Sequence, residues 1–264
     1  MLVLAAVDGS PASLAAARWA ADEAVRRGAP LRLAYAWPRP QHAAPGLPGV
    51  SEARGRALGM LADAAERVRR NSPGLEVDTA LLDRHAPCGI TAAADSAELL
   101  VLGSSAPHGP LGSVGLAVAA RAVCPVVLVP APPDPTGPPR EVVVGIDARD
   151  PAGAALVFAR RSAAVRGVPL RVVHAWMPDR QLLSAAESAA SAAAGESALA
   201  ELLARAPEPP AVVDVRRARA ADALADAARS ADLLVLGRTG HRLGPVTRAV
   251  IHRSGCPVAV VPRG

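Results

Sequence analysis

Short apolar runs alternate along the chain with longer segments that mix alanine with charged residues. In the first half the runs occupy residues 2–7, 31–37, 75–82, 99–103 and 126–129. Most of them are apolar throughout, which is typical of parallel strands that are covered on both faces and separated by helices. Because crossovers between parallel strands are right-handed, the pattern predicts a doubly wound α/β fold.

The second half of the chain repeats the first. The segment LVLAAVDGSP resembles VVVGIDARDP, and RGAPLRLAYAW resembles RGVPLRVVHAW. Asp8 then aligns with Asp147, and later in the chain Gly103 aligns with Gly237 at a smaller offset. A shared order with a shrinking offset indicates duplication followed by loss of loop residues.

A proline-rich segment separates the two copies. Residues 130–139 read PAPPDPTGPP, which is the composition of an inter-domain linker. We therefore predict two tandem domains, residues 1–130 and 140–264, joined by a linker over residues 131–139. The second domain should repeat the first with strands at 169–176, 211–216 and 258–261 and an alanine-rich helix near 181–206.

Helix boundaries are marked in both copies. Ser10 and Asp150 each precede a proline, so each offers a side-chain oxygen at the N-cap and a proline at the first helical position. Gly28 and Gly167 follow the same helices and are expected at their C-terminal ends.

The composition limits the classes of function. Apolar residues make up 51% of the chain, and the net charge is +5. The chain contains no lysine, and its scattered arginines argue against a nucleic-acid surface. Three cysteines without C-x-x-C spacing favour a reducing compartment and no metal site. With neither a basic leader nor a membrane span in the sequence, we expect a cytoplasmic protein.

The predicted topology brings one aspartate to a glycine-rich loop. In a doubly wound sheet, ligands bind beyond the carboxyl ends of the strands where the strand order reverses, here between the first and fourth strands. Asp8 should face the loop after Gly103 there. Gly112, Ser113 and Val114 open the next helix, whose N–H groups and dipole can receive phosphate.

Several segments, in the right order, resemble the universal stress protein family. They include VDGSPASLAAARWAADEAVRRGAPLRLAYAW, ELLVLG and GSVGLAVAARAVCPVVLV of the first half. The resemblance implies an adenine nucleotide alpha hydrolase-like domain of five parallel strands in the order 3-2-1-4-5, present twice. It also implies a role in stress tolerance or dormancy.

ATP-binding members of that family carry the signature G-x-x-G-(nine residues)-G-[ST]. They also have an aspartate after strand 1, here Asp8, and a backbone contact to adenine near the end of strand 2, here Ala36. In the first half Gly103 and the pair Gly112-Ser113 match, but Ala106 replaces the second glycine and four residues are missing. Gly109 could substitute for the lost glycine, at the wrong spacing.

The second half departs further from the signature. Gly237 and Gly240 match its first two glycines, but only three residues separate Gly240 from Gly244. Pro245 replaces the Ser or Thr and supplies neither an N–H nor a hydroxyl. The resemblance therefore implies a weakened adenine-nucleotide site in the first domain and a lost one in the second.

Three functions remain open at this point. We favour a non-catalytic regulator that binds ATP with Mg, or another adenine nucleotide, in the first domain and acts on an unidentified regulatory protein. The alternatives are a nucleotide-free interaction scaffold, in which Gly103 and Gly112 serve only as turn and cap glycines, and a weak metal-dependent ATP hydrolase that uses Asp8 or Asp147 as its base. No standard catalytic motif is present. The two domains are expected to pair as an internal pseudo-dimer, and two chains could pair further as a homodimer.

Overall fold

The computed structural model describes residues 1–37, 48–104, 112–131, 141–147, 153–177, 185–204 and 211–263. The chain divides into two compact units, Met1–Pro133 and Asp134–Gly264. Most of the predicted linker lies outside the described residues. No helix in the described ranges combines the length and the apolar character that a membrane span needs.

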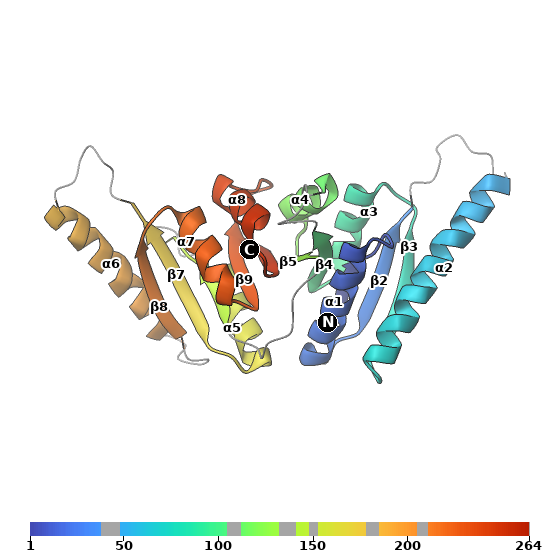
Figure 1. The fold of residues 1–264 in the computed structure, drawn as a ribbon, viewed down its shortest axis with the longest axis horizontal. Coiled ribbons are helices and arrows are strands. Elements are labelled where there is room, and N and C mark those ends of the chain that lie inside the picture. The colour runs from blue at the N-terminus through green and yellow to red at the C-terminus, as the bar shows by residue number, and fades with distance from the viewer. Residues whose placement is uncertain are drawn as a thin grey trace. The chain divides into compact units, whose positions relative to one another are not determined.

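The described part of the first unit contains five parallel strands in the order β3-β2-β1-β4-β5 (Figure 1). This confirms the doubly wound fold and the order 3-2-1-4-5. The strands are β1 (Val3–Ala6), β2 (Leu31–Ala36), β3 (Val77–Leu82), β4 (Leu99–Ser104) and β5 (Val126–Pro130).

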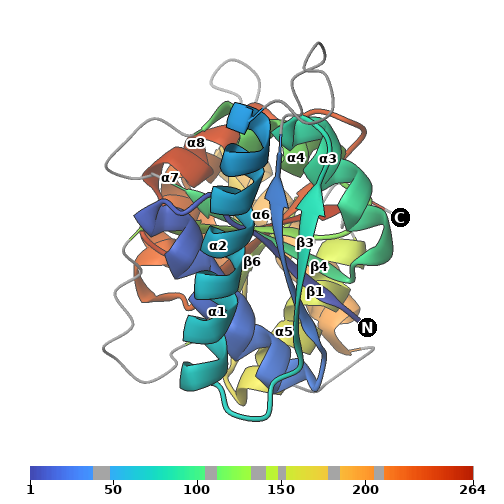
Figure 2. The same cartoon turned by 90° about the vertical axis from the view of Figure 1, so that its right-hand side faces the viewer.

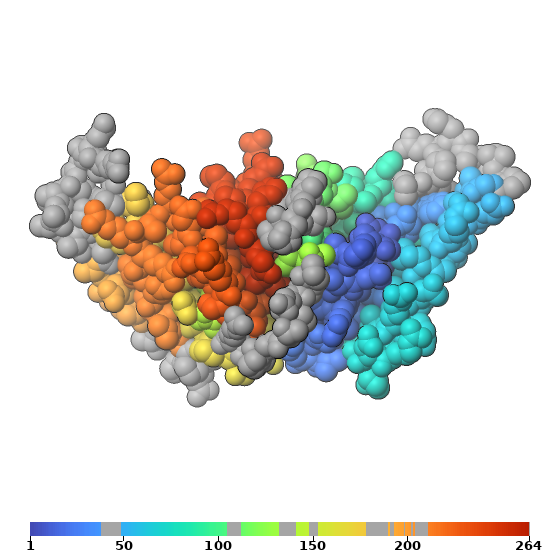
Figure 3. Space-filling view, in the orientation of Figure 1, coloured from blue at the N-terminus to red at the C-terminus, as the bar shows by residue number. Residues whose placement is uncertain are grey.

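Helices cover both faces of this sheet. They are α1 (Pro11–Arg27), α2 (Pro48–Asn71), α3 (Ala86–Ala93) and α4 (Ser113–Arg121). The helices α1 and α2 contact each other on one face, and α3 and α4 contact each other on the opposite face (Figure 2). In the space-filling view, α1 and α2 form adjoining surfaces in blue and cyan (Figure 3). Coverage on both faces explains why the central strands are almost entirely apolar and buried, whereas the edge strand β3 carries exposed Asp78 and Thr79.

Local signals set the ends of α1. The Ser10 side chain accepts a hydrogen bond from the Ser13 N–H at the N-cap, and Pro11 follows it. Gly28 ends the helix in the left-handed conformation, with φ of 60°. Between these ends, Ala16, Ala20 and Ala24 are fully buried against the sheet. Small side chains at this helical spacing let α1 lie close to β1 and β4.

The second unit repeats this architecture with the order β8-β7-β6-β9-β10 among its described residues. Its strands are β6 (Val142–Gly145), β7 (Leu170–Trp176), β8 (Ala211–Arg217), β9 (Leu233–Arg238) and β10 (Val258–Pro262). Its helices are α5 (Gly153–Arg166), α6 (Ala185–Ala204), α7 (Ala220–Ala227) and α8 (Pro245–Arg253). The predicted cap at Asp150 lies outside the described residues, whereas Gly167 has the expected positive φ of 65°.

Candidate functional site

Asp8 lies just beyond the carboxyl end of β1 and is exposed. Its Oδ1 accepts a hydrogen bond of 2.9 Å from the Ser10 N–H. Partial burial acts to raise the pKa of Asp8, but hydrogen bonds from Ser10 and Ser13 outweigh it and hold the pKa below its ordinary value. The carboxylate is therefore ionised at neutral pH.

Ala36 is the last residue of β2, the strand next to β1. The hydrogen bonds from Val3 N–H to the Pro30 carbonyl and from Val7 N–H to the Ala34 carbonyl show which side of β2 faces β1. Because backbone groups alternate along a strand, the N–H and carbonyl of Ala36 point toward the same side. The described β1–β2 register ends at Ala6 and Ala34, so these groups lie beyond it.

Gly103 is a residue of β4 rather than of the following turn, and packing requires it to be glycine. A Cβ at this position would lie 2.5 Å from the carbonyl carbon of Ala12 and 2.7 Å from the backbone nitrogen of Ser13. The first turn of α1 thus packs directly against the end of β4. The interpretation of Gly103 as a turn glycine is wrong, because a close approach of two backbones demands it.

Gly112 has no such structural requirement. It is the N-cap of α4, with φ of −56° and ψ of 134°, which any residue adopts. A Cβ here would meet no heavy atom of the described residues within 4 Å. The first hydrogen bond of α4 runs from the Leu116 N–H to the Gly112 carbonyl, so the N–H groups of Ser113 and Val114 have no partner within the helix.

The described residues therefore bring Asp8, Ala36, Gly103 and the start of α4 to the carboxyl edge of the first sheet. Gly109, the remaining predicted site residue, lies outside the described residues, as do its neighbours in the loop.

The corresponding edge of the second unit is built differently. Arg238 pairs with Pro262 in the sheet, as Ser104 pairs with Pro130 in the first unit. Arg238 is only 8% exposed, and its Nη1 donates a hydrogen bond to the Gly240 carbonyl in the loop before α8. A buried arginine is thus hydrogen-bonded to the loop of the second unit, where the first unit has a serine.

The start of α8 also differs from the start of α4. Gly244 is its N-cap, with φ of −63°, and Pro245 is its first residue. This confirms Pro245 as a helix-start residue. Because proline has no N–H, the second unit lacks the donor that the Ser113 N–H provides in the first unit.

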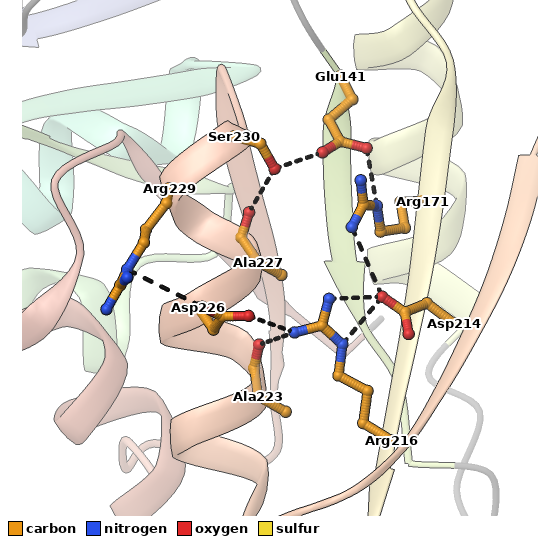
Figure 4. A network of polar contacts seen from close by, with 9 residues as sticks. All are labelled: Glu141, Arg171, Asp214, Arg216, Ala223, Asp226, Ala227, Arg229 and Ser230. Atoms are coloured by element: carbon orange, nitrogen blue, oxygen red, sulfur yellow. Dashed lines mark hydrogen bonds and ion pairs between the residues drawn. The ribbon is translucent and has the colours of Figure 1, made fainter.

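A cavity of about 350 Å³ in the second unit lies away from this edge. Its lining includes Glu141, Leu170 and Arg171, which stand at the amino ends of β6 and β7. Figure 4 shows Arg171 between Glu141, at 2.8 Å, and Asp214, at 3.6 Å. Arg216 also pairs with Asp214, at 2.7 Å, and supplies a second positive charge. Because two arginines thus balance two carboxylates, we assign the network to tying the sheet together rather than to binding a ligand.

The described residues away from this edge offer few further candidates for a functional site. The described residues contain no cluster of three or more His, Cys, Asp or Glu side chains that could hold a metal ion. Sequence reasoning missed two residues at the edge itself, Ser13 and Arg238. The short loop before Pro245 could have drawn attention to Arg238, whereas Ser13 resembles any other serine in the first turn of a helix.

Comparisons with known proteins agree with this architecture. The model of the Universal stress protein family matches residues 1–130 and 139–262. A universal stress protein of Mycobacterium bovis is 33% identical over 285 residues, covering 98% of this chain and 96% of its own. Another, from Mycobacterium tuberculosis, is 36% identical over 177 residues, covering 65% of this chain and 63% of its own length.

A solved structure shows the same fold over the whole chain. The crystal structure of a universal stress protein from Archaeoglobus fulgidus superposes with a TM-score of 0.76 at 19% identity, covering 100% of this chain and 98% of that one. With two family matches and a relative that matches over 98% of this chain, the chain belongs to the universal stress protein family.

Proposed function

We propose that the protein is a non-catalytic stress-response regulator that binds an adenine nucleotide, ATP with Mg²⁺, in its first unit. The start of α4 carries the proposal: the N–H groups of Ser113 and Val114 have no partner within the helix, and Gly112 before them has neither a backbone conformation nor a contact with the described residues that calls for glycine. A glycine at a helix N-terminus lets a ligand approach the N–H groups closely, and those groups favour phosphate.

Each site residue is proposed to contact a different part of the nucleotide. The N–H groups of Ser113 and Val114 would face phosphate oxygens, and the backbone of Ala36 would face the base. Because Asp8 is ionised, it would repel a bare phosphate and instead accept hydrogen bonds from the sugar or hold the magnesium ion. Bound magnesium would neutralise part of the phosphate charge.

The second unit is proposed to bind no nucleotide. Pro245 lacks one donor at the start of α8, and the buried Arg238 is hydrogen-bonded to the preceding loop. The two units would then differ in function while sharing one fold.

Calorimetric titration of Mg-ATP into nucleotide-stripped full-length protein tests the assignment. We expect one site per chain. Gly112→Val should abolish binding, because its side chain would fill the space above the N–H groups of α4. Gly244→Val is the matched control, since a Cβ at Gly244 also meets no heavy atom within 4 Å, and it should keep the site.

The outcomes separate the candidate functions. Two sites per chain would show that Pro245 and Arg238 do not exclude nucleotide. Unchanged affinity in Gly112→Val would refute the assigned site. Structures of universal stress proteins in complex with cAMP and with dAMP are known, so both ligands belong in the titration series.

A nucleotide-free scaffold is the second candidate, and the structural requirement for Gly103 favours it. No binding at millimolar nucleotide would select it. Phosphate release that disappears in Asp8→Ala would instead select a weak ATP hydrolase. The expected pairing of the two domains and of two chains stays a prediction, which analytical ultracentrifugation of the full chain and of each half can test.

A further inference from the structure

Ser13 lies in the first turn of α1 and is 5% exposed. Its hydroxyl has two partners on the preceding turn. The Oγ accepts a hydrogen bond of 3.2 Å from the Asp8 N–H and donates one of 3.0 Å to the Ser10 carbonyl. A small buried hydroxyl thus bridges two parts of the segment that carries Asp8.

Ser10 completes the connection from the other side. Its Oγ accepts the Ser13 N–H at 3.2 Å, and its own N–H donates to Asp8 Oδ1 at 2.9 Å. Four hydrogen bonds therefore join Asp8, Ser10 and Ser13 in a closed circuit. Gly9, with φ of 82°, provides the turn that the circuit needs.

The circuit is anchored to the sheet through Ser13. The backbone of Ala12 and Ser13 packs against Gly103 so closely that no Cβ fits between them. The position of Ser13 is therefore set by the end of β4, and Ser13 in turn sets the distance from β4 to the Asp8 backbone.

We propose that Ser13 is a positioning residue, which holds Asp8 in the orientation that ligand binding at the carboxyl edge of the first sheet requires. Without the Ser13 hydroxyl the Asp8 N–H loses its hydrogen-bond acceptor, and the turn from Val7 to Ser10 can adopt more backbone conformations. The carboxylate then samples orientations that do not face the ligand, and binding has to restrict it again. This inference rests on the proposed nucleotide site.

The test for positioning is a double-mutant cycle on the full-length protein. Ser13→Ala should weaken Mg-ATP binding about tenfold, the factor that one lost hydrogen bond carries. In an Asp8→Asn background the same substitution should have little further effect, because a residue that acts through Asp8 loses its influence with the carboxylate. Equal weakening in both backgrounds, or unchanged affinity in Ser13→Ala, would overturn the inference.

A second measurement needs no nucleotide. Carboxyl carbon NMR of ligand-free protein follows the titration of Asp8, whose pKa should rise toward its ordinary value in Ser13→Ala. An unchanged Asp8 pKa would also overturn the inference. Ser96→Ala is the control, because the Ser96 hydroxyl is exposed and bonds only the Ala93 carbonyl among the described residues. If wild-type protein binds no nucleotide, the proposed function fails while this titration still decides the role of Ser13.

Discussion

Gly103→Ala tests whether the first turn of α1 packs against the end of β4 as closely as the structure indicates. The new Cβ would lie 2.5 Å from the carbonyl carbon of Ala12, 2.6 Å from its oxygen and 2.7 Å from the Ser13 nitrogen, whereas ordinary contacts begin at 3.4 Å. All three atoms belong to the backbone, so no rotamer change relieves the overlap. The first turn of α1 must move by roughly 1 Å, and such backbone shifts cost about 3 kcal/mol, the upper end for overpacked sites.

A smaller effect on the unfolded chain opposes this loss of stability. Replacing glycine by alanine reduces the conformational entropy of the unfolded state and stabilises the folded state by up to about 1 kcal/mol. The net effect of Gly103→Ala is therefore a loss of about 2 kcal/mol in the free energy of unfolding of the first unit.

Urea unfolding followed by circular dichroism measures this loss, with each unit fitted to its own transition. Gly59→Ala is a control that should raise the free energy of unfolding rather than lower it. Gly59 is exposed within α2, and a Cβ there meets nothing within 4 Å, so alanine should stabilise the helix by about 0.5–1 kcal/mol. If the free energy of unfolding of Gly103→Ala lies within 0.5 kcal/mol of the wild-type value, the close packing of α1 against β4 is refuted.

Two further predictions concern titratable groups. A hydrogen bond from Arg216 holds the pKa of Asp214 below its ordinary value of about 3.9. The stability that this pair contributes is present above that value and lost as the pH falls through the lower folded pKa, so Arg216→Met should flatten the acid limb of a stability–pH curve. Burial raises the pKa of Cys124 and Cys256 to about 11, whereas Cys88 is exposed. A thiol reagent at pH 8 should therefore label one cysteine in the native protein and three after unfolding.

The fold was predictable because each element carries its own local signal. Ser10 before Pro11 marks the start of α1, and Gly28 marks its end, as the structure confirms. The apolar strands identify a sheet covered on both faces without any knowledge of their partners. Strand ends were less well defined. The third strand begins at Val77 rather than at residue 75, since the preceding residues contain no feature that distinguishes a turn from a strand.

The site was less predictable because its residues act through distant neighbours. The role of Gly103 depends on how closely α1 approaches β4, and only the packed structure contains that distance. Ser13 acts through a hydrogen bond to Asp8 that a helix-start serine does not reveal. Arg238 is buried and donates a hydrogen bond to the Gly240 carbonyl of the following loop, and the sequence shows the length of that loop but not its course.

The two units share one fold but carry different residues at the edge where nucleotide binding is proposed. Ser104 and Arg238 occupy the same register position, each opposite a proline of the neighbouring strand. The sheet accepts either residue because its stability comes from backbone hydrogen bonds and from apolar residues closer to its centre. Ser104 and Arg238 are the last residues of β4 and β9, so their side chains differ while the backbone pairing of the strands stays the same. Gly112 and Gly244 both begin their helices without a backbone conformation that requires glycine, and the residue that follows, Ser113 or Pro245, decides whether an N–H is offered there.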